Sequence, residues 1–230
     1  MKVEIYSDVA CPWCYIGQRR FQRALAALPL GNRVEVVYRS YQLDPTMPHD
    51  PVPMNEYLQR RFGARSEGMQ QQVAEAARGE GIEIDFAGGV IVNTLTAHRL
   101  LRLAEQEYGV AVQRGLTEKL FEAHFERGQD ISNHGVLSDL AAAVGTDVAR
   151  VRDYLGSGEG LKETRAAIEA ASALGVRAVP TFVFDGQHAL EGAQPTSTFL
   201  QVIEQLDAAA TKSGSGSEGD AYCVDGACSV

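Results

Sequence analysis

The alternation of apolar and polar positions divides the chain into three parts, and the first predicts a strand–helix–strand unit. Residues 2–7 and 33–41 alternate as strands do, whereas residues 12–28 carry apolar side chains at helical spacing. Pro12 suits the first position of this helix, since the N–H group that proline lacks would have no partner there. The first forty residues therefore predict a βαβ unit with its strand-to-helix turn just before Pro12.

The second part of the chain is helical. Residues 44–53 contain four of the eight prolines and are expected to form a loop. The pairs Asn133-His134 and Thr146-Asp147 are plausible helix starts, because side-chain oxygens of such residues can accept hydrogen bonds from first-turn N–H groups. Helices are expected over 53–62, 66–79, 93–108, 112–126, 134–143, 147–155 and 158–174.

The third part returns to strands. Residues 181–185 and 188–191 are expected to pair as a hairpin, because the Asp-Gly pair between them favours a tight turn. Residues 196–208 predict a final amphipathic helix, and the Gly- and Ser-rich run after it is typical of a flexible linker. Without the helical block, the order of elements is β-α-β-α-β-β-α. The sequence thus predicts an α/β fold with a mixed central sheet and a large all-helical insertion.

This order of elements also predicts the domain boundaries. Residues 1–44 and 175–210 are expected to form the sheet domain, and helix 158–174 leads the chain back to it. Residues 45–157 are the inserted helical domain. Residues 211–230 are expected to form a flexible tail.

Composition and charge narrow the classes of partner. The chain has 230 residues, 45% of them hydrophobic, and a formal net charge of -9. This acidic balance argues against nucleic acid or an anionic membrane surface as a partner. No apolar run is long enough to span a membrane. The N-terminal segment includes Glu4 and Asp8 and lacks the features of a secretory signal, so we expect a cytoplasmic protein.

The four cysteines form two closely spaced pairs, Cys11 with Cys14 and Cys223 with Cys228. A pair at positions i and i+3 lies on one face of a helix and can close a disulfide or exchange with one. Cys11 falls at the expected helix N-terminus, where the helix dipole favours a thiolate and lowers the thiol pKa. We therefore expect Cys11 to be the accessible attacking thiol and Cys14 to be the shielded resolving thiol.

A CxxC pair is also half of a zinc site, which is the alternative to redox chemistry for Cys11 and Cys14. Its other half would have to come from the second cysteine pair or from histidines such as His98 or His124. Zinc ribbons use the CxxC spacing twice, whereas the second pair here has the spacing CxxxxC on a flexible tail. We therefore expect no metal, since a CxxC between a strand and a helix of a βαβ unit favours redox chemistry.

Four stretches of sequence resemble the DsbA-like branch of the thioredoxin superfamily, and more narrowly its FrnE-type oxidoreductases. They are SDVACPWCYIG around the first cysteine pair, NTLTAHRL at 93–100, GVRAVPTFVF at 175–184, and CVDGAC near the C-terminus. The resemblance implies a thioredoxin fold with the helical insertion. It also implies that Pro180 is cis beside the CxxC motif, and that the Val179 backbone pairs with a substrate strand.

The resemblance extends to candidate substrate-binding residues. Pro12 and Trp13 lie inside the motif, and Trp13 is either a packing residue or faces the substrate. Asn93 and His98 are expected to line a substrate or glutathione cleft, over which the inserted helices form a cap. The simpler interpretation is that Asn93 caps a helix and that His98 is a packed or exposed helix residue.

The expected function is a thiol–disulfide oxidoreductase that oxidises, reduces or isomerises disulfides through CPWC. Its substrate would be a protein or a small molecule that carries a thiol or disulfide. We expect no tightly bound cofactor, with glutathione or a dithiol as redox partner, and a monomer or homodimer. A rival function is that of a glutathione-dependent transferase or isomerase that acts on small aromatic compounds. The related isomerases and kappa-class glutathione transferases typically have serine where Cys11 stands. A further rival is a non-catalytic metal-binding or chaperone-like module.

The second cysteine pair leaves two interpretations open. Cys223 and Cys228 flank an Asp-Gly pair that favours a turn, which can bring two thiols within disulfide range. The linker before them is long enough to reach the first pair. The tail either shuttles electrons to or from Cys11 and Cys14, or holds a local disulfide.

Overall fold

The computed structural model describes residues 1–29 and 34–214, with side chains up to residue 209. Four strands form one sheet: β1 (Lys2–Ser7), β2 (Glu35–Ser40), β5 (Thr181–Phe184) and β6 (His188–Glu191). Their order is β2-β1-β5-β6; β1 is parallel to β2 and antiparallel to β5, and β5 is antiparallel to β6. The expected mixed sheet and hairpin are confirmed.

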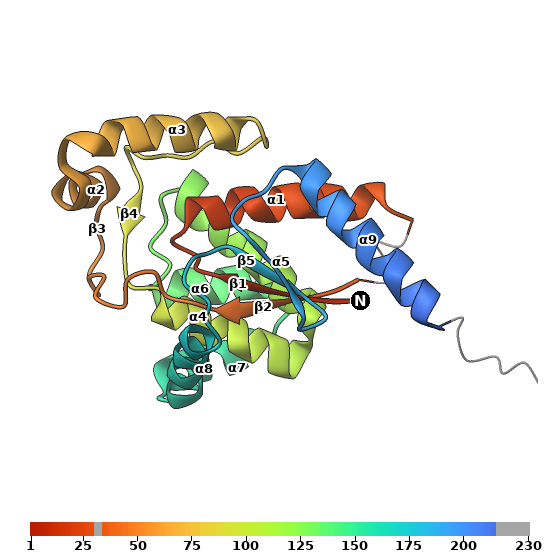
Figure 1. The fold of residues 1–230 in the computed structure, drawn as a ribbon. Coiled ribbons are helices and arrows are strands. Elements are labelled where there is room, and N and C mark those ends of the chain that lie inside the picture. Colours follow the sequence, from red (N-terminus) through yellow and green to blue (C-terminus); the bar gives the residue numbers. More distant parts are fainter. Residues whose placement is uncertain (30–33, 215–230) are drawn as a thin grey trace, which may run out of the picture.

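Helices cover both faces of this sheet (Figure 1). On one face lie α1 (Pro12–Ala27) and α9 (Thr196–Gly214), which pack against each other. The other face is covered by helices of the expected insertion and by α8, which leads back to the sheet. These helices are α4 (Leu95–Leu103), α5 (Val110–Phe121), α6 (His134–Ala142), α7 (Val148–Gly156) and α8 (Leu161–Ala173).

Alternation along the strands decides which side chains meet which layer. Val3 and Ile5 of β1 pair in register with Phe184 and Phe182 of β5, and all four are buried against α1 and α9. Tyr6 points to the opposite face and packs with Ala171 and Val176 at the end of α8. The period of two therefore builds one apolar core on each side of the sheet.

A smaller unit lies beyond the end of the sheet at which α1 begins (Figure 1). It contains α2 (Met54–Phe62), a 3₁₀ turn (Gly63–Arg65) and α3 (Ser66–Arg78). It also contains two short strands, β3 (Val52–Pro53) and β4 (Val90–Ile91), paired antiparallel. Glu80, just after α3, holds this unit to α1 through Arg20 at 2.8 Å and Arg23 at 2.9 Å.

The structure corrects several details of the sequence interpretation. The expected loop at 44–53 ends in β3, a two-residue strand too short to show a period. The expected helices 93–108 and 112–126 finish in π-helical turns, Ala104–Tyr108 and Glu122–Glu126. Helix α9 continues to Gly214, past the expected start of the tail.

The two expected helix starts are confirmed, with Asn133 and Asp147 as the N-cap residues. Asn133 accepts hydrogen bonds from Gly135 N and Val136 N, and Asp147 accepts them from Ala149 N and Arg150 N. The domain boundaries themselves stay a prediction.

The edge of the sheet at β2 is closed by a side chain. Gln113 of α5 is buried; its Oε1 accepts the Tyr38 N–H at 3.0 Å and its Nε2 donates to the Tyr38 carbonyl at 3.0 Å. The amide thus replaces a neighbouring strand at this position and leaves no unpaired backbone group there. It also attaches the helical block to the sheet.

We predict that Gln113→Leu destabilises the protein by about 3 kcal/mol, because two buried backbone groups of Tyr38 lose their partners. Urea denaturation of wild type and variant measures the change. Gln18→Leu is the matched control: Gln18 is equally buried, but neither of its amide atoms has a hydrogen-bond partner among the described residues. Removal of the Gln18 amide should lower the free energy of unfolding by less than about 1 kcal/mol. Equal costs for the two variants would contradict the role given to Gln113.

Candidate active site

The CPWC turn forms the start of α1. Cys11 is the N-cap residue with extended backbone, and its carbonyl accepts hydrogen bonds from Cys14 N at 3.0 Å and Tyr15 N at 3.4 Å. Pro12 follows at the first helical position, as expected. No side chain caps this terminus. The positive end of the helix dipole therefore faces the position of Cys11.

Both thiols of the pair are free and buried. Cys14 is 2% exposed, as expected, but Cys11 is only 4% exposed, which corrects the expectation of an accessible thiol. The Val179 carbonyl oxygen lies 3.7 Å from Cys11 Sγ, and Val179 is 168 residues away in the chain, so the sequence near the motif does not reveal this contact. Burial raises the pKa of Cys14 well above its ordinary value, and the neighbouring Cys11 raises it further.

A buried carboxylate supports the turn from behind. Asp8 is fully buried; its Oδ2 accepts the Leu43 N–H at 2.8 Å and its Oδ1 accepts the Ala10 N–H at 3.3 Å. The backbone carbonyl oxygen of Asp8 accepts the Cys11 N–H at 3.0 Å. The sequence analysis missed this role. An acidic residue among the apolar residues just before the CPWC motif could have indicated it.

His98 and Asn93 also lie behind the turn. The Nε2 atom of His98 is 3.3 Å from Asp8 Oδ1, and the side chain is buried. Asn93 donates to the carbonyls of Pro45 and Met47, at 3.0 and 3.3 Å, and its Oδ1 accepts the N–H at the start of α4. Neither residue lines the cavity at Cys11, so their substrate-binding role stays a prediction.

The loop before β5 completes the site on its other side. The Val179–Pro180 peptide bond is cis, as the resemblance implies. Cys11 Sγ lies 3.7 Å from the Val179 carbonyl oxygen. Gly17 of α1 permits this approach, since a Cβ there would lie 3.0 Å from Pro180 Cγ. The glycine at the end of CPWCYIG is therefore a packing requirement of the site.

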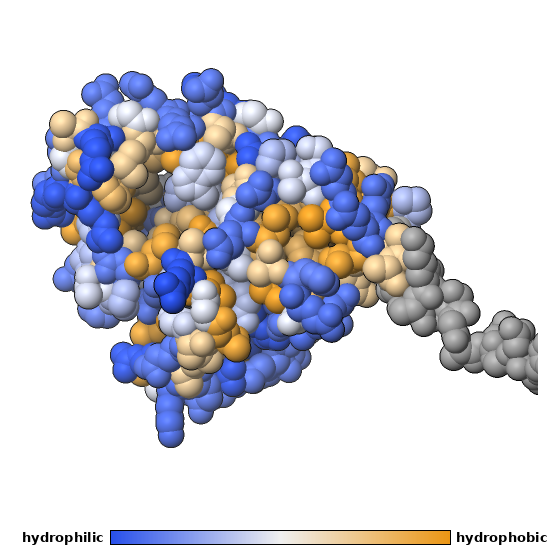
Figure 2. Space-filling view, in the orientation of Figure 1, coloured by the Kyte–Doolittle hydropathy of each residue, from blue (hydrophilic) through white to orange (hydrophobic). Residues whose placement is uncertain are grey.

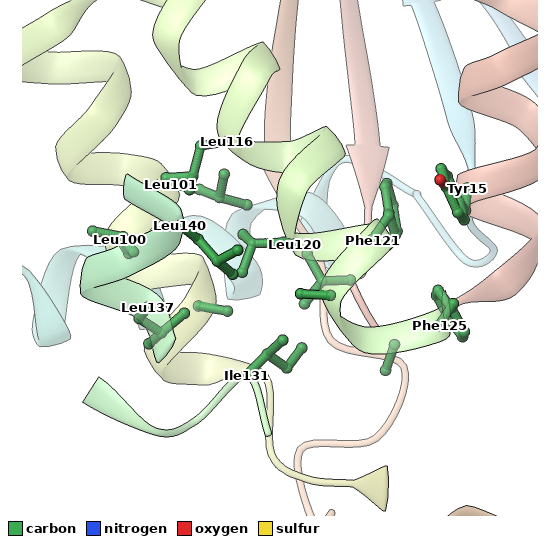
Figure 3. Close-up of a cluster of buried hydrophobic side chains, with 14 of the residues drawn as sticks. Tyr15, Leu100, Leu101, Leu116, Leu120, Phe121, Phe125, Ile131, Leu137 and Leu140 are labelled. Carbon is green, nitrogen blue, oxygen red and sulfur yellow. The ribbon is translucent and has the colours of Figure 1, made fainter. Parts of the chain in front are cut away.

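The first turns of α1 are also anchored in the core of the helical block (Figure 3). The Tyr15 ring stacks on Phe121 at 5.1 Å and on Phe125 at 6.3 Å between ring centroids. Its hydroxyl donates to Glu126 Oε1 at 2.5 Å. Tyr15, the residue after Cys14, thus connects α1 to the helical block, and the cysteine pair lies where the two meet.

A cavity of about 300 Å³ opens beside Cys11. One wall is the turn itself, including Cys11, Pro12 and Trp13, whereas Cys14 is not part of the lining. The facing wall is built from α2, α3, the segment after β2, β4 and the loop that precedes β4. Its apolar members are Leu43, Met47, Tyr57, Leu58, Phe62, Met69, Val73, Phe86 and Ile91. The cap expected over CPWC is therefore formed by α2 and α3.

A second histidine is buried near the site. His124 has no exposed surface, and neither ring nitrogen has a hydrogen-bond partner among the described residues. Burial lowers the pKa of His124 to about 4, although Asp8 and Asp130 act in the opposite direction. This histidine is neutral near pH 7.

The described part of the chain has no group of three or more His, Cys, Asp or Glu residues arranged to hold a metal ion. No helix among residues 1–29 and 34–214 is long and apolar enough to cross a membrane. Cys223 and Cys228 lie outside the described residues.

A strand–CxxC–helix turn beside a cis-proline loop, on a mixed sheet with a helical insertion, defines a thioredoxin-like fold of the DsbA type. Residues 2–204 match the family described as the DSBA-like thioredoxin domain. The chain belongs to this family.

Three relatives illustrate the range of similarity. The probable DsbA oxidoreductase SCO1869 of Streptomyces coelicolor is 32% identical, with a TM-score of 0.81, and the match covers 98% of this chain and 94% of that one. The uncharacterized protein YwbO of Bacillus subtilis is 26% identical over 87% of this chain and 94% of its own length. The cytosolic disulfide reductase DsbM of Pseudomonas aeruginosa, solved with GSH, is 20% identical with a TM-score of 0.63. That match covers 90% of this chain and 100% of DsbM, and at this identity it shows the shared fold.

We predict that iodoacetamide labels Cys11 before Cys14 in the reduced protein at neutral pH. Cys11 lines the cavity, whereas Cys14 lies outside it and its pKa is raised. Peptide mapping after a short reaction measures the ratio of labels, and a urea-unfolded sample is the control in which both should label. Equal labelling of the folded protein, or faster labelling of Cys14, would contradict the assignment.

We predict that His124 alone lowers the stability of the protein by about 3 kcal/mol as the pH falls from about 6.5 to about 4. The pKa of His124 is about 4 in the folded state, against about 6.5 in an unfolded chain. In this range the unfolded state therefore binds more protons than the folded state. The contribution of His124 to stability is present in full above pH 6.5 and is lost as the pH falls below that value. Denaturation curves at several pH values measure the slope. His124→Asn should flatten it, whereas His49→Asn, at an exposed histidine, should leave it unchanged.

Proposed function

We propose that the protein catalyses thiol–disulfide exchange through Cys11 and Cys14. The observation that carries this proposal is the position of the pair: Cys11 is at the N-terminus of α1 and in the wall of a cavity, while Cys14 is buried behind it. One thiol can thus meet a substrate while the other is shielded from it. Membership of the DSBA-like family supports the same chemistry.

The proposed exchange has two steps. The Cys11 thiolate attacks one sulfur of a substrate disulfide; a bond forms between Cys11 and that sulfur, and the other substrate sulfur leaves as a thiolate. The Cys14 sulfur, after losing its proton, then attacks the Cys11 sulfur and releases the second substrate thiolate. The substrate gains two electrons, and the protein is left with a Cys11–Cys14 disulfide. The reverse sequence oxidises a substrate dithiol.

The surroundings of each sulfur suit these steps. The Val179 carbonyl oxygen lies 3.7 Å from Cys11 Sγ, so a backbone edge is present where a substrate chain would lie. The raised pKa of Cys14 keeps it protonated during the first step. It therefore does not compete with Cys11 for the substrate, and its deprotonation belongs to the second step.

We predict that Cys11→Ser reduces the rate of insulin reduction by dithiothreitol to the uncatalysed rate, because the nucleophile of the first step is lost. Cys14→Ser should instead accumulate a mixed disulfide on Cys11, which intact-protein mass spectrometry detects as an adduct. Thermal unfolding of both variants controls for loss of fold. A Cys11→Ser variant that keeps the wild-type rate would exclude the proposed function.

A further inference from the structure

The charged groups of the cavity beside Cys11 are already paired with each other. Among the described lining residues these are Asp44 and Arg61, which form an ion pair. The Tyr57 hydroxyl donates to Asp44 Oδ2 at 3.0 Å and lies 3.1 Å from Arg61 Nη1. Hydrogen bonds from Thr46 contribute most to lowering the pKa of Asp44 to about 2, so this carboxylate is ionised at neutral pH. The charge of the arginine is therefore balanced within the wall.

Two uncharged polar side chains of the wall, Ser66 and Gln70, are bonded to each other. Ser66 is buried, and its hydroxyl oxygen accepts a hydrogen bond from Gln70 Nε2 at 3.0 Å. The lining described above thus provides no cation beyond the paired Arg61. A carboxylate brought into this cavity would lose its hydration without gaining a partner of opposite charge.

The rim of the cavity is apolar as well. Three large apolar side chains are markedly exposed in the described part of the chain, and two of them, Leu43 at 46% and Met69 at 42%, line this cavity. The third, Leu174, lies elsewhere. In Figure 2 the surface is hollowed beneath α2 and α3, and apolar side chains are visible there. The apolar surface therefore continues from Cys11 to the solvent.

We propose that this cavity selects disulfides in which the reacting sulfur carries a bulky apolar group, and that it discriminates against glutathione. The inference rests on the exchange reaction proposed above and names its substrate class. Glutathione carries two carboxylates, for which the wall offers no unpaired cation, whereas an apolar group gains free energy by leaving water. A volume of about 300 Å³ is at the lower end of the range for pockets that bury small molecules, so it admits one such group.

Two sources supply this chemistry: a large apolar side chain next to a cysteine in a polypeptide, and the body of a low-molecular-weight thiol. In both, the occupant enters the cavity beside Cys11 and its sulfur exchanges with that residue. The atoms and electrons balance as in the reaction above, since the apolar group changes only the binding of the disulfide.

The test compares how fast four disulfides oxidise the reduced protein. They are oxidised glutathione, the homodisulfides of N-acetyl-cysteinyl-glycinamide and N-acetyl-cysteinyl-phenylalaninamide, and bis(2-phenylethyl) disulfide. Trp13 is the single tryptophan and lies between the cysteines, so its fluorescence reports the redox state. Each second-order rate is divided by the rate of the same disulfide with dithiothreitol, which removes differences in intrinsic reactivity.

We expect the phenylalanine peptide to react about tenfold or more faster than the glycine peptide, with glutathione slowest. Equal acceleration by the phenylethyl disulfide would identify a small apolar thiol as sufficient, and acceleration by the peptide alone would identify a polypeptide source. Equal normalised rates for all four would overturn the inference and leave the exchange reaction standing. If no disulfide reacts with Cys11, the proposed function itself fails.

Variants at the rim of the cavity test whether the substrate preference depends on the apolar and charged character of the rim or only on the stability of the fold. Met69→Glu should remove most of the preference for the phenylalanine peptide, and Met69→Arg should raise the rate with glutathione by supplying an unpaired cation. Leu174→Glu is the matched control, because it makes the same kind of change at an exposed apolar residue outside the cavity, and it should keep the wild-type preference. Identical effects of the two glutamate variants would contradict the inference.

Discussion

The buried carboxylate of Asp8 is the group around which the candidate site is arranged. Its oxygens accept the N–H groups of Leu43 and Ala10 and contact His98 Nε2, and its carbonyl accepts the N–H of Cys11. These contacts join the end of β1 to the segment after β2, to α4 and to the CPWC turn. Because a buried carboxylate is costly without such partners, the arrangement of these elements is linked to the placement of the cysteine pair.

Asp8 also links two parts of the cavity lining, one through its backbone carbonyl and the other through its carboxylate. Cys11 and Leu43 both line the cavity; the Cys11 N–H is bonded to the Asp8 backbone carbonyl and the Leu43 N–H to the Asp8 carboxylate. Asn93 adds a second support, since it holds the carbonyl of Met47, another residue of the wall. The NTLTAHRL stretch thus contacts the candidate site indirectly: Asn93 bonds the backbone at Pro45 and Met47, His98 contacts Asp8, and no residue of the stretch lines the cavity.

Several features were predictable because their cause is local. The strands of the sheet follow from alternation, α1 from Pro12 and its apolar spacing, and two helix starts from Asn133 and Asp147 as N-caps. Other features have no local cause. The strand β3 exists only because β4, almost forty residues later, pairs with it. Gln113 closes the sheet edge at Tyr38, 75 residues earlier in the chain, and no periodicity marks that partnership.

The sequence by itself determined the order of the elements and the position of two cysteines at the start of a helix, because side-chain periodicity, proline geometry and capping act over a few residues. Tertiary structure decided that Cys11 is buried, that α2 and α3 form the wall opposite to it, and that Asp8 and His98 meet behind the turn. Asp8 and His98 are 90 residues apart in sequence. Contacts at such separations depend on how whole layers pack, and only the folded chain brings them together.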